Sequence, residues 1–346
     1  NSEIILFILI ILLFVLYSLL IAYYWQSWKA ISDFIPLNTT ASTTISIIIP
    51  ARNEEKNIGQ LFQALQNQTY PTELFEVIVV DDHSTDGTAA IVQQFPSVKL
   101  IQLKEDNINS YKKKAIETGI AAATGDLIVT TDADCLPGNN WLTTIAAFKT
   151  EKQSAFIAAP VVLENNNSLL QIFQTLDFLV LQGITGASVY KNAHSMCNGA
   201  NLAYEKKAFQ EVNGFQGIDN IASGDDMLLM HKIWKQYPDK VHYLKSKEAI
   251  VSTQPMKTWK AFFNQRIRWA SKAKSYGDKR IIVVLLLVYL LNLSFLVLSV
   301  VGFFCSMYWI FLLGLWLAKT MVEFPFVYSV ASFFNKKSLL KYFLFF

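Results

Sequence analysis

The chain has 346 residues, a formal net charge of +3 and 52% hydrophobic residues, among them 25 Phe. Together with a positive mean hydropathy, this composition argues against a protein that is soluble throughout. The small net charge, with Lys and Arg not gathered into a stripe, gives no support to a nucleic-acid partner. Cys135, Cys197 and Cys305 are odd in number and far apart, which fits neither a disulfide framework nor a zinc site. We expect them to be reduced thiols in a cytosolic domain.

The N-terminal part predicts a membrane anchor over residues 1–28. Residues 4–24 carry no charge, and this run exceeds the roughly 18 residues that indicate a membrane-spanning helix. The run has no basic leader before it and no small-residue cleavage site, and it ends in aromatic residues followed by Lys29. These features favour an uncleaved anchor whose C-terminal side faces the cytoplasm.

Residues 281–346 predict further transmembrane helices. The uncharged run 281–316 is expected to cross the membrane and turn near 302–306, and the chain returns through 308–331. Lys319 and Glu323 lie four residues apart in the returning segment, where they pair, mark a path for the acceptor, or snorkel toward the interface. Residues 339–346 look like the start of another span, so we expect the given chain to be a piece of a longer protein.

Residues 45–255 predict an α/β domain. Apolar strands near 46–50, 75–81, 98–102 and 127–129 alternate with amphipathic helices near 57–67, 87–94 and 112–123. Such alternation predicts a mostly parallel sheet with helices on both faces. A further strand is expected at 155–162, and a helix at 169–189 is expected at the membrane surface or under the domain. Neither a glycine-rich dinucleotide fingerprint nor a P-loop is present, so side chains at strand ends would hold any nucleotide.

Polar side chains follow three of the predicted strands. The first strand ends in PARNEE, the second in DDHSTDG and the fourth in an Asp-Ala-Asp triplet. Each cluster alone fits ordinary turn and helix-cap chemistry. Because parallel strands end at one edge of a sheet, where α/β proteins bind ligands, the clusters together predict an acidic crevice. Asp132 and Asp134, two residues apart where their strand ends, can both reach one hard divalent ion.

The segments PARNEE, VVDDHSTDGT and TTDADC, in this order, resemble the nucleotide-sugar domain of the membrane-bound family 2 inverting glycosyltransferases. This family includes enzymes of the ceramide glucosyltransferase, cellulose synthase and hyaluronan synthase types. The resemblance covers residues 45–279. It implies a GT-A type α/β fold, a nucleotide-diphospho-sugar donor and a divalent metal, Mg²⁺ or Mn²⁺.

The resemblance also implies a donor site. Asp81 and Asp82 look like the pair that meets the nucleotide base, and Asp132 and Asp134 look like the metal-binding motif on the diphosphate. Lys112 is similar to the family lysine that approaches the phosphates. The neighbouring lysines leave this placement open by one or two positions. The alternative to a phosphate contact is that these lysines lie on a solvated helix face. The donor contacts implied by these motifs are Pro50, Arg52, Glu54, Asp81, Asp82, Lys112, Asp132, Ala133 and Asp134.

A small-residue segment at 198–203 and the acidic pair after it are the next candidates. The glycine and alanines permit close approach of a ligand or of another backbone. Acids that open a helix also serve as ordinary caps. Inverting transfer needs a carboxylate that takes the proton of the acceptor hydroxyl. The family motif that supplies this base matches at Asp226, with Asp225 where the family usually has Glu, so Asp225 is the alternative base.

Residues 256–275 predict a basic amphipathic helix in the membrane interface, within a segment that we extend to residue 279. The run Gln265-Arg266-Ile267-Arg268-Trp269 is similar to the Gln-x-x-Arg-Trp signature of membrane-bound family members. The resemblance implies that Gln265 and Trp269 contact the acceptor end. It also implies that Arg266 and Arg268 lie near the diphosphate, where a cation stabilises the leaving group.

These features together predict an enzyme that transfers a sugar, with a UDP-sugar as the expected donor, to a membrane lipid at the cytoplasmic face. One alternative is a processive polysaccharide synthase that extends and exports a glycan. An alternative of another class is a non-catalytic membrane protein that senses a nucleotide sugar. A composition rich in Ile, Asn, Lys and Phe favours a bacterial source, and hence the bacterial plasma membrane as the location.

Overall fold

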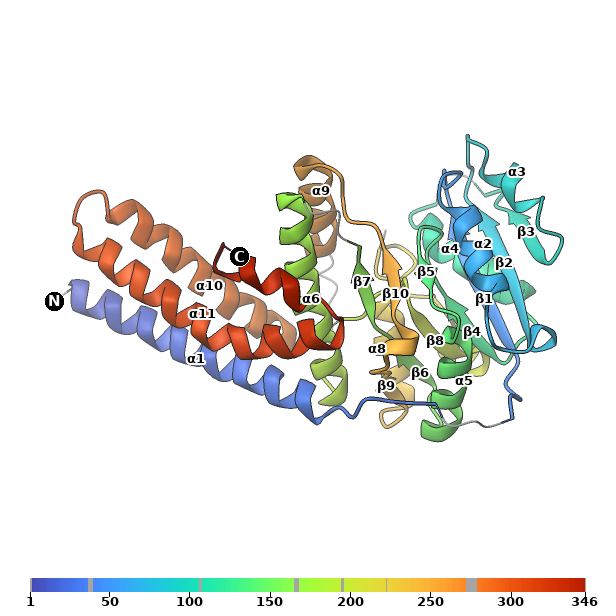
Figure 1. Ribbon diagram of the computed structural model, residues 1–346, viewed down its shortest axis with the longest axis horizontal. Helices are drawn as coiled ribbons and strands as arrows, with labels where there is room; N and C mark the ends of the chain where they lie inside the picture. Colours follow the sequence, from blue (N-terminus) through green and yellow to red (C-terminus); the bar gives the residue numbers. More distant parts are fainter. Residues whose placement is uncertain are drawn as a thin grey trace.

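The computed structural model describes residues 2–36, 40–105, 108–164, 168–193, 196–221, 223–271 and 279–345. A bundle of long helices lies at one end of the molecule and an α/β domain at the other (Figure 1). Residues 272–278, which belong to the predicted interfacial segment, lie outside the described residues.

The main sheet, within the described ranges, has seven strands in the order β3-β2-β1-β4-β8-β6-β9. All neighbouring strands are parallel except that β8 runs antiparallel to both β4 and β6. This agrees with the expected mostly parallel GT-A type sheet. The strands are β1 (Ile45–Ala51), β2 (Phe75–Asp81), β3 (Val98–Gln102), β4 (Leu127–Thr130), β6 (Phe156–Ala158), β8 (Leu202–Glu205) and β9 (Val241–Tyr243).

Successive side chains of a strand point to opposite faces of the sheet. Both faces of this sheet are buried. In β1, Ile47 and Ile49 pack with helices α2 (Ile58–Gln66) and α5 (Trp141–Lys152). Ile48 points the other way, toward α4 (Tyr111–Ala122) and α8 (Met227–Gln236). Burial of each isoleucine contributes roughly 1.5 to 3 kcal/mol, so the centre of the sheet is a rigid support for the loops at its edge.

The predicted strand at 155–162 is wrong as a single element. It divides into β6 and β7 (Val161–Leu163), which belong to different sheets. The break falls at Pro160, which has no N–H to donate to a ladder and whose carbonyl accepts from Asn201 Nδ2 at 2.8 Å. Strand β7 instead joins the small sheet β5-β10-β7. The other strands of that sheet are β5 (Leu136–Pro137) and β10 (Val251–Thr253).

Short helices complete the domain and its junction with the bundle. The predicted amphipathic helix begins later than expected: α9 starts after Thr258, whose hydroxyl accepts from the Ala261 N–H, and it is described as far as Ala270. The remaining short elements are η1 (Thr72–Leu74), α3 (Thr88–Val92), α7 (Lys206–Glu211), η2 (Lys247–Ala249) and α9 (Trp259–Ala270).

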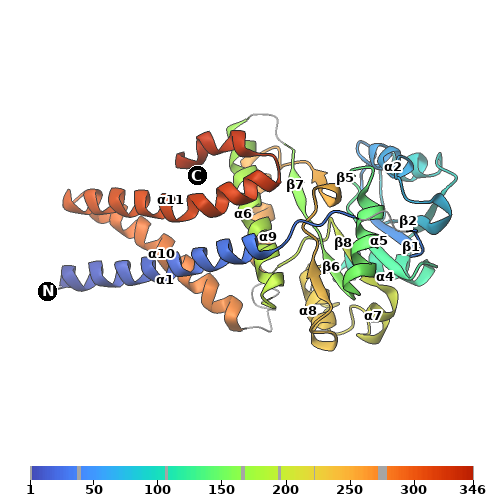
Figure 2. The same ribbon diagram turned by 60° about the horizontal axis from the view of Figure 1, so that its bottom comes forward.

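Four helices among the described residues are long and apolar enough to cross a membrane. Three of them, α1 (Ser2–Ala30), α10 (Lys279–Val301) and α11 (Met307–Phe333), run side by side in both views (Figures 1 and 2). The fourth, α6 (Leu169–Tyr190), stands across them, between the bundle and the α/β domain. The most apolar window of α6 is 72% buried within the molecule, against 17 to 22% for the other three. Helix α6 therefore packs under the domain, which is one of the two placements predicted from the sequence.

The C-terminal residues pack against the bundle. Residues Lys337–Phe345 form the 3-10 helix η4, which folds back on α11 and α6. Leu339 is buried with Ile172 and Leu176 of α6, and the Phe343 ring lies 5.8 Å from that of Phe324. Apolar packing against α6 thus holds this segment near the domain.

The charged pair within α11 is satisfied inside the bundle. Lys319 Nζ lies 2.7 Å from Glu323 Oε1, and the Tyr17 hydroxyl of α1 donates to the same carboxylate. Pairing, the first of the predicted alternatives, is what the described structure contains. It neutralises two charges that are costly in an apolar setting.

Candidate active site

The predicted polar clusters meet at one edge of the main sheet. Strands β2, β1 and β4 are parallel neighbours, and Ala51 at the end of β1 lies opposite Asp81 at the end of β2. The segments that leave these strands therefore emerge together. The sequence prediction of a shared edge is confirmed.

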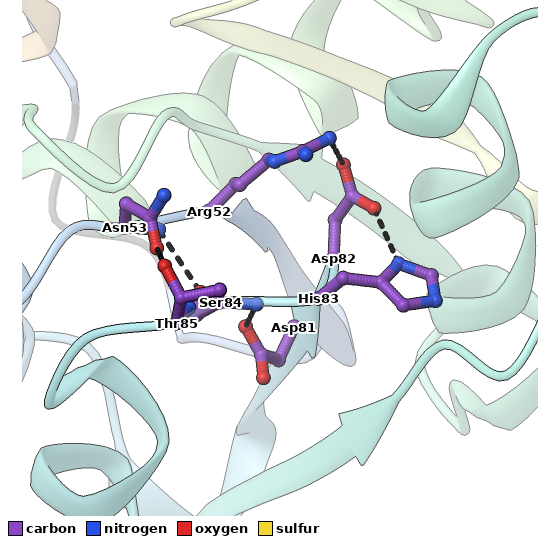
Figure 3. Close-up of polar contacts among 7 residues, drawn as sticks. All are labelled: Arg52, Asn53, Asp81, Asp82, His83, Ser84 and Thr85. Atoms are coloured by element: carbon purple, nitrogen blue, oxygen red, sulfur yellow. Dashed lines mark hydrogen bonds and ion pairs between the residues drawn. The ribbon is translucent and has the colours of Figure 1, made fainter. Parts of the chain in front are cut away.

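One part of this edge is built from the first two clusters (Figure 3). The Asp82 carboxylate lies between two side chains, 3.4 Å from Nη1 of Arg52 and 2.9 Å from Nδ1 of His83. Asp81 accepts from the Ser84 N–H at 3.2 Å, which closes the turn after β2. The Tyr111 ring at the start of α4 flanks the group, with Arg52 Cζ 5.7 Å from its centre. Charged groups and an aromatic face thus surround the predicted base pocket.

The two clusters also hold each other in place. Asn53 adopts a left-handed conformation, with φ of 58°, which asparagine tolerates better than most residues. Its N–H donates to Ser84 Oγ at 2.9 Å, and its Oδ1 accepts from the Thr85 N–H at 2.8 Å (Figure 3). The loops after β1 and β2 therefore form one hydrogen-bonded unit.

A second part of the edge is an acidic cluster around Lys112. Lys112 Nζ lies 2.7 Å from Asp132 Oδ1 and 3.4 Å from Asp225 Oδ2. Burial alone would lower the pKa of Lys112, but the carboxylates of Asp132 and Asp225 outweigh it and raise that pKa. Lys112 therefore faces carboxylates, and its side chain is 36% exposed. The triplet after β4 and the acidic pair before α8, far apart in sequence, share one ammonium group.

Neighbouring carboxylates carry unneutralised charge. Burial raises the pKa of Glu54, and the charges of Asp134 and Asp132 raise it further. A hydrogen bond from Asn57 acts to lower this pKa but does not outweigh them. Burial and the Asp132 charge also raise the pKa of Asp134. A group of carboxylates whose pKa values are raised in this way favours an additional cation nearby.

The residues around the triplet fit a hard divalent cation. One ligand atom each of Asp132, Asp134 and Cys135 lie within 4.8 Å of one another. Burial raises the pKa of the Cys135 thiol well above its usual value, and sulfur is a soft ligand that suits a hard divalent cation less well than oxygen does. The two carboxylates therefore remain as candidate ligands, and oxygen is what Mg²⁺ and Mn²⁺ prefer. Thr253, which the sequence gave no reason to select, donates to Asp134 Oδ2 at 3.2 Å and fixes that carboxylate.

The predicted base and its alternative differ in their surroundings. Asp225 is buried and faces Lys112. Asp226 is partly exposed and caps α8, accepting from the Met227 N–H at 2.7 Å. A Cβ atom at Gly199 would lie 3.1 Å from Asp225 Oδ2 and 3.2 Å from Lys112 Nζ. The close approach expected at this glycine is thus made by the side chains of the acidic cluster.

The Gln-x-x-Arg-Trp helix packs against α6. Arg266 forms an ion pair with Asp177 of α6, and its guanidinium carbon lies 4.4 Å from the centre of the Trp269 ring. Gln265 and Trp269 are half-buried, whereas Arg268 is exposed. Arg266 is therefore turned toward α6. Contacts of these four residues with a donor or an acceptor stay a prediction.

Pro50 and Ala133 are the remaining predicted donor contacts. Pro50 is paired with Val80 within the sheet, and Ala133 is buried between the two carboxylates of the triplet. Asn201, in the small-residue segment singled out from the sequence, is fully buried and donates to the carbonyls of Pro160 and Ala249. Its contacts reach segments that are distant in sequence, so no local pattern predicts them.

Comparison with known proteins identifies the domain. Residues 46–212 match the model of the family described as Glycosyl transferase family 2. The chain is 29% identical over 233 residues to the probable glycosyltransferase YdaM of Bacillus subtilis, covering 65% of this chain and 54% of that protein. It is 23% identical over 228 residues to a poly-beta-1,6-N-acetyl-D-glucosamine synthase of Staphylococcus epidermidis, covering 65% and 53%. The chain thus spans about half the length of these relatives.

A shorter match and a solved structure complete the comparison. Over 101 residues the chain is 34% identical to the beta-monoglucosyldiacylglycerol synthase of Synechocystis sp., covering 28% of this chain and 21% of that protein. The structure of a mannosyltransferase from Pyrobaculum calidifontis, in complex with GDP-Man and Mn²⁺, superposes with a TM-score of 0.64 at 20% identity. It covers 97% of this chain and 96% of its own, so the likeness in fold extends through the helical bundle.

Proposed function

The chain carries a family 2 glycosyltransferase domain in residues 46–212, and on that premise we propose that it adds one sugar to a membrane lipid. The donor is a nucleotide-diphospho-sugar, with a UDP-sugar as the first candidate, and the reaction takes place at the cytoplasmic face. Because the chain spans only part of the length of its relatives, the donor and the acceptor of the whole protein also belong to this proposal.

The contact of Lys112 with both Asp132 and Asp225 carries the proposal. It brings the candidate metal-binding triplet and the candidate base segment to one point, although 93 residues separate Asp132 from Asp225 (225 − 132). A protein that only senses a nucleotide sugar needs the triplet but has no use for a base beside it. The arrangement therefore favours transfer over sensing.

The reaction assigned to these residues is a single displacement. The Asp226 carboxylate accepts the proton of the acceptor hydroxyl while that oxygen attacks C1 of the donor sugar. The bond from C1 to the diphosphate oxygen breaks, its electron pair leaves with the nucleoside diphosphate, and the configuration at C1 inverts. The ammonium of Lys112 offsets negative charge at the leaving group.

Asp132 and Asp134 would hold Mg²⁺ or Mn²⁺, with Thr253 fixing the second carboxylate. When bound, such an ion neutralises charge on the diphosphate and so makes it a better leaving group. A bound cation would stabilise the charged forms of Glu54 and Asp134, and so would lower the pKa values that burial and the neighbouring carboxylates raise.

A lipid acceptor is favoured by the bundle. The buried side chains where α1, α10 and α11 meet are mainly apolar, and they include Ile10, Leu298 and Leu315. A processive synthase needs a polar path for its polymer, which the apolar contacts among these residues do not favour. The glucosyldiacylglycerol synthase among the relatives acts on a lipid, as its name states, whereas the poly-N-acetylglucosamine synthase makes a polymer. Polymer synthesis therefore remains the alternative that a product analysis must test.

Asparagine variants of the two candidate bases test the mechanism. For Asp226→Asn we expect unchanged binding of the nucleoside diphosphate and a loss of transfer of about 10²- to 10⁴-fold, the usual contribution of a positioned base. Asp225→Asn is the matched comparison, because it removes the charge facing Lys112. Full transfer by Asp226→Asn would refute its role, and selective loss in Asp225→Asn would move the base to Asp225.

A further inference from the structure

The acidic pair sits at the end of a long irregular segment. Residues 212–226 connect α7 to α8, and their described part consists of turns without a regular helix or strand. Gly224, in a left-handed conformation with φ of 86°, stands directly before Asp225 and Asp226, which end the segment. Because no ladder of backbone hydrogen bonds fixes such a segment, other contacts must set the position of the two carboxylates.

Lys113 supplies these contacts. Its side chain is 2% exposed, and its Nζ donates to the carbonyl oxygens of Ile218 and Ile221, both at 2.6 Å, and of Ser223 at 2.9 Å. An ammonium group has three donors, and each of the three matches one carbonyl. Burying a charge is costly unless it is hydrogen-bonded in this way, and charge-assisted bonds are stronger than neutral ones. The cage therefore fixes the segment onto α4.

The neighbouring residue on the same helix holds the rest of the site. Consecutive residues of an α-helix point about 100° apart, so Lys112 faces Asp132 and Asp225 while Lys113 faces the segment. The first turn of α4 thus contacts the candidate metal triplet with one lysine and the segment that bears the candidate base with the next. Ser223, the last carbonyl of the cage, is only two residues before Asp225.

We propose that Lys113 is a positioning residue for transfer: its carbonyl cage sets the distance between the Asp225–Asp226 pair and the metal-binding triplet. The inference rests on the proposed function and deepens it. Lys113 itself need not touch donor or acceptor. Its loss would let the base drift while the donor pocket formed by the loops after β1 and β2 stays intact.

A second lysine fixes the beginning of the same segment. Lys232 of α8 donates to the carbonyl oxygens of Gly214 at 2.5 Å and Gln216 at 2.8 Å. These carbonyls lie farther along the chain from Asp225 than those that Lys113 holds. We therefore expect the loss of Lys232 to disturb the position of the candidate base less than the loss of Lys113 does.

The test compares Lys113→Met with Lys114→Met in the purified full chain. Lys114, the next residue on α4, forms partly exposed ion pairs with Glu105 and Glu117, whereas the three described hydrogen bonds of the cage come from Lys113. The measurements are kcat per nucleotide-binding site, the donor KM, and the Kd of the nucleoside diphosphate with Mg²⁺ or Mn²⁺. We expect Lys113→Met to lower kcat about 10- to 100-fold, as small misplacements of reacting groups do, with the Kd within about 2-fold. Lys114→Met should leave all three values within about 2-fold.

A merely structural role predicts another pattern. It would reduce the number of nucleotide-binding sites while the remaining sites kept their kcat, and that result would overturn the proposal. If Lys113→Met yields no folded protein, Lys113→Gln decides, because its amide retains two donors in the cage. For Lys113→Gln an intermediate loss of kcat per site supports the proposal, and an unchanged value refutes it. A wild-type protein inactive with every donor would refute the proposed function, whereas an active wild type with an equally active Lys113 variant would refute only this inference.

Discussion

Three consecutive lysines at the start of α4 have three different environments. Lys112 lies among carboxylates, Lys113 is buried in a cage of carbonyls, and Lys114 pairs with acids at the surface. Helical geometry separates them, since each residue is rotated by about 100° from the one before. The sequence motif singled out Lys112, but a buried lysine cannot be told from a solvated one by its residue type.

Gly199 gives a test of the acidic cluster at the residue scale. For Gly199→Val we expect a loss of transfer of at least about 10-fold, because even its Cβ would lie 3.1 Å from Asp225 Oδ2 and must displace it. Gly138→Val is the control, since a Cβ there meets nothing within 4 Å. Both variants should be compared by transfer rate and nucleotide affinity. Equal activity of the two would contradict the close packing around Asp225.

At the scale of elements, the sequence predicted the sheet edge because its signals are local. Each strand is a short apolar run, and parallel strands necessarily end together. The division of 155–162 into β6 and β7 was missed, because apolar residues continue across Pro160 and only the sheet pairing reveals the switch. Thr253 and the contacts of Asn201 were missed because the partners, Asp134 and Pro160, are distant in sequence.

Glu76 in β2 ties three elements together at the opposite end of the sheet. It accepts from Ser46 Oγ at 2.6 Å, the Thr124 N–H at 2.6 Å and Thr124 Oγ1 at 2.7 Å. Although partial burial acts to raise the pKa of Glu76, these hydrogen bonds outweigh it and lower that pKa below 4.5. We expect Glu76→Gln to destabilise the fold by about 1 to 2 kcal/mol at neutral pH.

The pH dependence follows from the direction of the shift. Because the folded pKa of Glu76 lies below the unfolded one, its stabilising effect is complete above about pH 4.5 and is lost as the pH falls through the folded pKa. The difference in Tm between wild type and Glu76→Gln should therefore shrink on acidification. Exposed Glu73, with the same substitution, serves as the control. A difference that stays constant with pH would contradict the assigned hydrogen bonds.

Helix α6 joins the bundle to the domain through close contacts of its glycines. A Cβ at Gly183 would lie 2.5 Å from Val330 Cγ2 and 2.7 Å from Phe326 Cζ, both of α11. We expect Gly183→Leu to lower the Tm of the detergent-solubilised protein, since overpacking costs about 1 to 3 kcal/mol. Gly314→Leu in α11 is the control, because a Cβ there meets nothing within 4 Å. An unchanged Tm for Gly183→Leu would show that α6 does not pack closely on α11.

At the scale of the whole molecule, the α/β domain and the bundle share one apolar core. The cluster that includes Ile48 of the sheet continues through Leu179 of α6 to Phe326 of α11. Lys245 adds a polar connection: its Nζ donates to the Ile31 carbonyl at 3.0 Å and lies 3.1 Å from Asp33 Oδ1, just past the end of α1. The edge that bears the candidate active site is therefore held at a fixed place relative to the membrane helices.

This arrangement explains how the proposed reaction joins a soluble donor to a membrane acceptor. The donor pocket lies at the sheet edge, and the exposed face of α9, with Trp259, Phe263 and Ile267, stands beside α6 at the junction with the bundle (Figure 1). Apolar side chains on a basic helix are suited to the membrane interface. In the proposed reaction a lipid headgroup would thus approach from the side of α9 and α6, and the nucleotide sugar from the side of the sheet edge.

The most direct test of the proposed transfer is a release assay on the purified protein in detergent. The assay supplies Mg²⁺ or Mn²⁺, a panel of nucleotide sugars and a total membrane lipid extract, with a chelator as the control. We expect metal-dependent release of the nucleoside diphosphate together with a glycolipid that carries one added sugar. A high-mass, lipid-free product would contradict the lipid acceptor, and absence of release above the chelated control with every donor would contradict glycosyl transfer itself.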